Sequence, residues 1–177
     1  MAKAFLDLSK LRPVKRDRDK KASRDRDTLR YSLTKPIHIQ HMNLSISLIL
    51  LYSIVGAVIL TYAPFLVVAW GRLQAGYNQA APRAMFDKLP DYAQRATWAH
   101  QNSFEALTIY GLAALMAYAT GVESDWAKFA AIAFITARLL YSVFYILNIP
   151  IARSLMFAIG SLSGWTLFAL SILQVMN

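Results

Sequence analysis

The sequence predicts an all-α membrane protein built as a bundle of four transmembrane helices. Of its 177 residues, 56% are hydrophobic and only 16% are charged, whereas soluble domains carry about 25% charged residues. The mean hydropathy is accordingly positive, at +0.36. Four long segments after residue 43 carry few charges. Trp70, Trp98 and Trp126 fall near the expected helix ends, as an aromatic belt at the membrane surface requires.

We expect the four helices at 44–70, 95–119, 126–147 and 151–176. The first has no charged residue, and as a helix it would be about 40 Å long, longer than the hydrocarbon core of about 30 Å. Pro64 is expected to kink it. A polar loop of 24 residues, 71–94, follows. The other two connections, 121–125 and 148–150, are short.

The composition of residues 1–43 predicts a charged, disordered extension ahead of this four-helix domain (44–177). They hold 12 of the 19 Lys and Arg residues, and the run Arg16-Asp17-Arg18-Asp19 recurs at 24–27. Alternating charges leave little apolar surface to bury. Alternatively, the extension docks a protein partner or anionic headgroups. Because exporting so many basic residues is difficult, we expect the N-terminus on the cytoplasmic side.

Composition also excludes several functions. The chain has no cysteine, which rules out disulfides, thiolate zinc sites and cysteine nucleophiles. Only three scattered histidines are present, His38, His41 and His100, so no metal is expected. Nucleic acid is not an expected partner, because most basic residues precede an apolar body.

Polar side chains inside an apolar span each need a partner or a role. These polar residues lie on two helical faces. Arg95, Asn102 and Glu105 share one face of the second helix, and Arg138, Tyr141 and Tyr145 share one face of the third. At 1.5 Å per residue, Glu105 and Arg138 both lie about 15 Å deep. We therefore expect an ion pair between Glu105 and Arg138, which either fixes the helix register or serves a site.

Nearer the membrane surface, the same side collects Arg95, Tyr145 and Arg153. Guanidinium groups hold carboxylates in bidentate fashion, so this cluster suits a ligand with several carboxylates. Contact with lipid headgroups is the alternative. In the fourth helix, Gly160 and Gly164 permit close helix contact.

These residues resemble the MAPEG family, the membrane-associated proteins in eicosanoid and glutathione metabolism, in its bacterial, microsomal-transferase-like form. The run Ala99-His100-Gln101-Asn102-Ser103-Phe104-Glu105 is similar to the family's Ala-His-x-Asn-x-x-Glu. Arg95, the pair Ala137-Arg138 with Tyr145, and Arg153-Ser154 match further family positions. Helix one matches by position only.

The resemblance implies a homotrimer in the lipid bilayer with glutathione, as co-substrate, between subunits. Carried over position by position, the glutathione-binding residues would be Arg95, His100, Asn102, Glu105 and Arg138, and the catalytic residues Arg153 and Tyr145. The implied activity is a glutathione transferase or peroxidase that acts on small lipophilic electrophiles or lipid hydroperoxides.

One position departs from the family pattern. Trp98 stands where glutathione-handling members usually carry arginine, four residues before Asn102. The lost charge-assisted contact is worth about 1.5–3 kcal/mol. An alternative function is therefore a non-catalytic trimeric scaffold or lipid-binding protein that uses its basic extension to dock a partner or an anionic surface.

Overall fold

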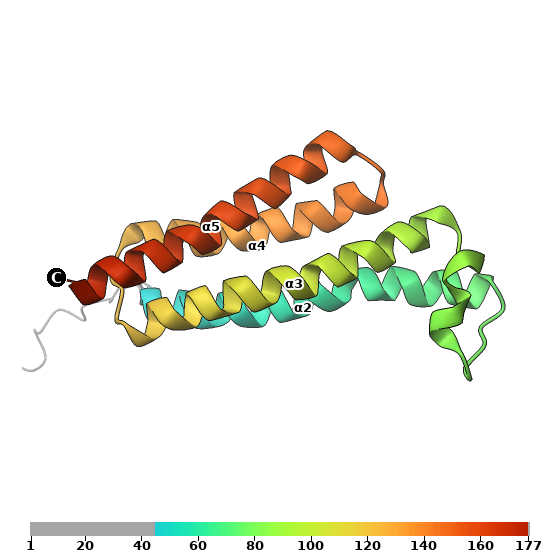
Figure 1. Ribbon diagram of the computed structural model, residues 1–177, viewed down its shortest axis with the longest axis horizontal. Helices are drawn as coiled ribbons and strands as arrows, with labels where there is room; N and C mark the ends of the chain where they lie inside the picture. The colour runs from blue at the N-terminus through green and yellow to red at the C-terminus, as the bar shows by residue number, and fades with distance from the viewer. Residues whose placement is uncertain (1–44, 177) are drawn as a thin grey trace, which may run out of the picture. The chain divides into compact units, whose positions relative to one another are not determined.

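The computed structural model describes residues 45–176 (Figure 1). The expectations for residues 1–43, including disorder and docking, lie outside the described residues. Within this range the chain forms four long helices and one short 3-10 segment: α2 (Ile46–Gln74), η2 (Pro82–Lys88), α3 (Asp91–Ala119), α4 (Asp125–Ile146) and α5 (Pro150–Met176). The described part of the chain is therefore all-helical, as predicted.

The four helices run up and down as two adjoining pairs, α2 with α3 and α4 with α5 (Figure 1). α3 also contacts α4 and α5, and α2 contacts α4. The chain reversals after α2 and after α4 lie at the same end of the bundle (Figure 1). This end carries η2, and we call it the η2 end.

Small residues form most of the buried faces of α3 and α4. The buried face of α3 consists of alanine, serine and one tyrosine: Ala93, Ala96, Ala99, Ser103, Tyr110, Ala113, Ala114 and Ala117. α4 presents Ala127, Ala130 and Ala131 to the core that Tyr110, Ala113, Ala114 and Ala117 share, and it also buries Ala137. Such faces let helix backbones approach closely inside a membrane. Gly71 of α2 serves the same purpose, because a Cβ added there would overlap the Cβ of Ala93.

Helix bounds differ from the sequence prediction at the η2 end. α2 continues to Gln74 and α3 already begins at Asp91, so the expected long loop is shorter and contains η2. Pro90 occupies the N-cap of α3 and Asp91 its first turn, where an acidic side chain favours a helix start. α2 continues through Pro64 as one helix.

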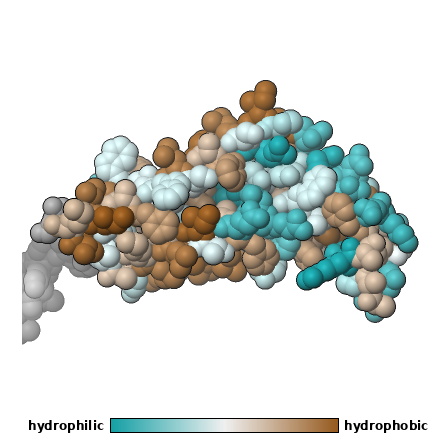
Figure 2. Space-filling model, viewed as in Figure 1, coloured by the Kyte–Doolittle hydropathy of each residue, from teal (hydrophilic) through white to brown (hydrophobic). Residues whose placement is uncertain are grey.

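Three helices, α2, α4 and α5, are long and apolar enough to cross a membrane. α3 is equally long but is not one of these three, because polar residues occupy much of its first half. Figure 2 shows hydrophilic residues gathered towards the η2 end, while hydrophobic residues cover most of the opposite end. The chain is thus an integral membrane protein whose polar side chains concentrate at one end.

Candidate functional site

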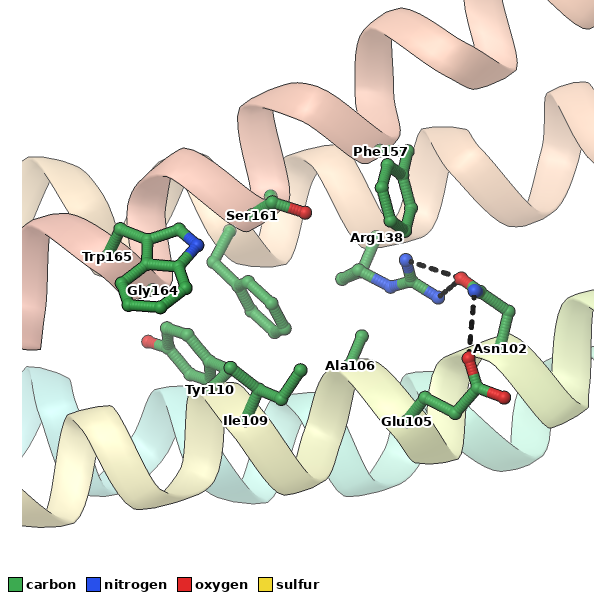
Figure 3. Close-up of a pocket in the computed structure, with 12 residues that line it drawn as sticks. Asn102, Glu105, Ala106, Ile109, Tyr110, Arg138, Phe157, Ser161, Gly164 and Trp165 are labelled. Carbon is green, nitrogen blue, oxygen red and sulfur yellow. Dashed lines mark hydrogen bonds between the residues drawn. The ribbon is translucent and has the colours of Figure 1, made fainter.

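The centre of the candidate site is the Arg138 side chain of α4, which is only 4% exposed. Nη1 and Nη2 both donate to Asn102 Oδ1 at 3.2 Å, and Nη2 also donates to Ser103 Oγ at 3.0 Å. Asn102 Nδ2 in turn donates to the Glu105 carboxylate at 3.4 Å (Figure 3). Asn102 therefore links the buried cation to an exposed carboxylate.

The expected ion pair between Glu105 and Arg138 is thus wrong in its direct form. The two helices do meet at this depth, but the Asn102 amide oxygen receives the guanidinium in place of the Glu105 carboxylate. Glu105 lies on an exposed face of α3. A neutral acceptor satisfies Arg138 without the desolvation that a buried carboxylate would suffer.

Small residues around Arg138 make room for its side chain. Ser103 is buried on α3 and supplies its hydroxyl. On α5, Gly160 faces the arginine stem, since a Cβ added there would lie 3.6 Å from Arg138 Cδ. Gly160 therefore lies at the contact between α5 and α4, but an added Cβ would fit there at ordinary van der Waals distance. Gly164 is buried too, but a Cβ added there would meet no atom within 4 Å.

A cavity of about 130 Å³ extends from this hydrogen-bond network between α3, α4 and α5. Its polar end is formed by Asn102, Glu105 and Arg138, and its other end is mainly apolar and aromatic (Figure 3). Tyr110, Phe134, Phe157 and Trp165 are among the aromatic residues that line it. The cavity can therefore hold a polar group beside an apolar one.

Aromatic rings connect Arg138 with the predicted catalytic pair. The Arg138 guanidinium carbon lies 4.3 Å from the Tyr141 ring centroid, and the Tyr141 and Tyr145 rings are 5.5 Å apart in an edge-on arrangement. The Arg153 guanidinium carbon lies 4.5 Å from the Tyr145 ring centroid. The predicted shared face of Arg138, Tyr141 and Tyr145 is thus confirmed, and it continues to Arg153 of α5.

Arg95 approaches the same end of α4 from α3. Its Nε donates to the backbone carbonyl of Ile146 at 2.9 Å, in the last turn of α4, whose carbonyl groups lack partners within the helix. Arg95 and Arg153 both remain partly exposed. Two guanidinium groups therefore stand at the η2 end, with the remaining donors of Arg95 available to a ligand.

His100 does not join this cluster. Its Nδ1 lies 2.6 Å from the backbone carbonyl of Thr61 on α2, and its ring packs 5.3 Å from Phe65 and 5.0 Å from Phe104. It lines a second cavity, of about 490 Å³, that shares no lining residue with the first. The structure therefore separates His100 from the other predicted glutathione-binding residues.

Sequence reasoning missed Ser103 and Tyr110 as members of the site. Tyr110 stacks on Phe134 with ring centroids 3.6 Å apart, and its hydroxyl shares a 2.6 Å hydrogen bond with Ser53 of α2. Tyr110 follows Ser103 by seven positions, which places both on one helix face. That spacing was the available signal. Tyr141 was expected on the correct face, but was not assigned to the site.

The arrangement can recognise a ligand that carries both signs of charge. Glu105 presents a carboxylate fixed by Asn102, which suits an ammonium group. Arg95 and Arg153 present guanidinium groups at the η2 end, which suit carboxylates. A cation near Tyr145 also favours the ionised form of a thiol placed there.

Neither a curated protein nor a solved structure matches the chain. The family model described as "MAPEG family" matches residues 49–173, a range that begins in α2, ends in α5 and contains every predicted site residue. The match covers more than half of the chain, and it confirms the resemblance seen in the motif around Asn102. The chain therefore belongs to the MAPEG family.

Proposed function

We propose that this MAPEG protein is a glutathione-dependent transferase or peroxidase that acts on lipophilic electrophiles or lipid hydroperoxides. One observation carries the proposal: Glu105, Asn102 and Arg138 form a linked network that continues through Tyr141 and Tyr145 towards Arg153. Glutathione has one ammonium group, two carboxylates and one thiol. The exposed carboxylate and the two outer arginines complement these charges.

The proposed roles follow from the position of each group. Glu105 accepts the ammonium group, and Arg95 and Arg153 bind carboxylates. The Arg153 guanidinium, held over the Tyr145 ring, also stabilises the thiolate, which is the nucleophilic form of the thiol. Asn102 and Arg138 are positioning residues, because their hydrogen bonds fix the Glu105 carboxylate.

The transferase reaction needs no metal. The thiolate sulfur forms a bond to the electrophilic carbon, and the leaving group departs with its electron pair. In the peroxidase reaction two glutathione molecules are oxidised to the disulfide, while the hydroperoxide is reduced to an alcohol and water. Apolar substrates would reach the site from the bilayer.

The proposal includes four membrane crossings and a homotrimer. If α3 crosses with the other helices, its exposed Glu105 and Trp98 face either lipid or protein. A charged side chain on a lipid-facing surface in mid-membrane costs at least about 2.5 kcal/mol. Covering the polar face of α3 with neighbouring subunits removes that cost, and would place glutathione between subunits as the family resemblance implies.

The first experiment measures thermal unfolding in detergent with and without reduced glutathione. A ligand present at 100 times its dissociation constant, and bound only by the folded state, adds about 2.7 kcal/mol. We expect glutathione to raise Tm in the wild type but less in Arg153→Ala, and we expect Arg153→Ala to lose turnover of an aryl chloride. Lys128→Ala, at the other end of α4, is the matched control and should keep both. A fully active Arg153→Ala variant would refute the mechanism.

A second candidate function is a non-catalytic scaffold or lipid-binding protein. Trp98 favours it, because this side chain packs on Phe86 of η2 with ring centroids 5.6 Å apart, where catalytic relatives usually carry arginine. A chain lacking residues 1–43 separates the two functions. An enzyme should keep its turnover in this truncated form, whereas a scaffold should lose its partner.

A further inference from the structure

We propose that Arg95 is a positioning residue for the reaction. Its Nε fixes the turn between α4 and α5, while the other nitrogens of the same guanidinium group bind a ligand carboxylate. Carboxylate binding is thereby coupled to the placement of Arg153, which follows this turn. The inference rests on the proposed function, in which Arg153 stabilises the thiolate.

The end of α4 leaves one carbonyl group without a backbone partner. The chain turns through Asn148, which adopts a left-handed conformation with φ of 58°. Its N–H donates to the Tyr145 carbonyl at 3.2 Å, and the N–H of Ile149 donates to the Phe144 carbonyl at 2.9 Å. This pair of bonds is the Schellman motif, which satisfies two of the last carbonyl groups of a helix. The next carbonyl is that of Ile146, whose partner in a continued helix would be the N–H of residue 150.

Arg95 supplies the donor that the backbone cannot. Residue 150 is Pro150, the first residue of α5, and proline has no N–H. Nε of Arg95 on α3 donates to the Ile146 carbonyl at 2.9 Å instead. Hydrogen bonds from a charged donor are stronger than those between neutral groups. The short turn 147–149 is therefore held from α3 by a strong side-chain bond.

This bond has a counterpart deeper in the bundle. Arg95 lies seven positions before Asn102 on α3, and Ile146 lies eight positions after Arg138 on α4. Antiparallel helices in one register bring both pairs together, about 11 Å apart along the axis. The bond from Arg95 and the bonds from Arg138 to Asn102 thus join α3 and α4 at two levels, and they oppose rotation of one helix against the other.

The turn carries the predicted catalytic pair on its two sides. Tyr145 directly precedes Ile146, and Arg153 lies in the first turn of α5, where its N–H donates to the Ile149 carbonyl at 3.0 Å. The Arg153 guanidinium carbon lies 4.5 Å from the Tyr145 ring centroid. A displacement of about 1 Å in a reacting site can cost about 100-fold in rate. Holding this turn therefore sets where Arg153 stands against the ligand.

The rest of the Arg95 guanidinium group links this turn to the ligand. The side chain is partly exposed, and the bond from Nε leaves Nη1 and Nη2, which can hold a carboxylate in bidentate fashion. A carboxylate bound there restricts rotation of the guanidinium plane. Ligand binding then also holds the Ile146 carbonyl, and with it the turn, in place.

The first test measures hydrogen exchange by mass spectrometry on the full-length protein in detergent. We expect the amides of 147–149 to exchange at least about tenfold faster in Arg95→Met than in the wild type. The turn 120–122, which closes α3 with the same pair of backbone bonds, is the internal control and should not change. If Arg95→Met does not fold, Arg95→Lys, which lacks the guanidinium fork, replaces it.

Kinetics then separate positioning from simple binding. Lysine keeps a positive charge for the carboxylate but cannot hold the carbonyl and the carboxylate in one plane. Arg95→Lys should therefore lower kcat about tenfold while KM for glutathione changes little. The ultraviolet absorbance of the bound thiolate at neutral pH should fall with kcat, because Arg153 is displaced. Lys88→Gln, which removes an exposed charge of η2 at the same end, should keep all three values.

Three results would overturn the proposal. Unchanged exchange at 147–149 in Arg95→Met would show that the bond from Nε does not hold the turn. Equally faster exchange at 120–122 would indicate general destabilisation, and a raised KM with unchanged kcat in Arg95→Lys would make Arg95 a binding residue alone. If the wild type neither binds nor turns over glutathione, the proposed function fails, while the exchange measurement still decides whether Arg95 fixes the turn.

Discussion

Replacing Asn102 by leucine removes the acceptor that two terminal nitrogens of Arg138 share. Only the Ser103 hydroxyl then remains as a hydrogen-bond partner of a guanidinium that is 4% exposed. A hydrogen bond to a charged group contributes about 1.5–3 kcal/mol. Because the two bonds share one oxygen atom, we count them as one, and we expect Asn102→Leu to lower the free energy of unfolding by about 2–3 kcal/mol.

The matched variants test whether the buried cation causes this loss. Adding Arg138→Met to Asn102→Leu removes the stranded charge, so the double variant should be more stable than Asn102→Leu alone by at least about 1 kcal/mol. Glu105→Gln should cost less than about 1 kcal/mol, because Glu105 is exposed and bonds to Asn102 rather than to Arg138.

Reversible unfolding in mixed micelles, followed by circular dichroism, measures these differences. A direct ion pair predicts the opposite order, with Glu105→Gln the most damaging single change, and it predicts rescue in the charge-swapped double variant Glu105→Arg/Arg138→Glu. If either result is found, the Asn102-bridged arrangement is refuted. If the Asn102→Leu/Arg138→Met variant is no more stable than Asn102→Leu, a stranded charge does not explain the loss.

Three further predictions concern packing, a buried hydroxyl and orientation. Gly71→Ala forces a methyl group against an alanine of α3 and should cost about 1–3 kcal/mol, whereas Gly111→Ala, which meets no neighbour within 4 Å, should leave Tm unchanged or raise it. Tyr110→Phe removes the 2.6 Å bond to a serine hydroxyl of α2 and should cost about 1 kcal/mol; a wild-type Tm would show that this bond contributes nothing. Because the chain has no cysteine, single cysteines report topology directly: with a cytoplasmic N-terminus, an impermeant maleimide should label Lys88→Cys in intact cells and Glu123→Cys only after lysis. The reverse labelling would place the η2 end in the cytoplasm.

The number and order of the helices were predicted correctly because each span is a long apolar run separated from the next by polar residues. The bounds failed where composition does not define the end of a helix. α2 passes Trp70 and continues through Arg72 to Gln74. A charged residue indicates where the apolar run ends, but it does not terminate the helix. The start of α3 had a readable signal in Pro90 followed by Asp91.

The site was predictable in its helices and depth but not in its hydrogen bonds. Spacing correctly brought α3 and α4 together at Arg138. It could not distinguish Asn102 from Glu105 as the partner, because residues three apart differ by only about 60° around a helix. Helix rotation and side-chain conformation decide between them, and neither can be read from residue spacing. The second cavity depends on η2, whose fold no periodicity indicated.

The separation of His100 from Asn102 has a geometric cause that bears on the assembly. Successive helical residues turn by about 100°, so side chains two positions apart point about 160° away from each other. In α3 this directs His100 towards Thr61 of α2 and Asn102 towards Arg138 of α4. One subunit therefore cannot present both side chains to the same small ligand. If glutathione contacts both, it must lie between two copies of the chain. If His100 does not contact glutathione, Asn102→Ala, which frees the Glu105 carboxylate, should weaken glutathione binding and His100→Ala should not. The comparison of these two variants thus decides whether the cavities belong to one shared site or to two.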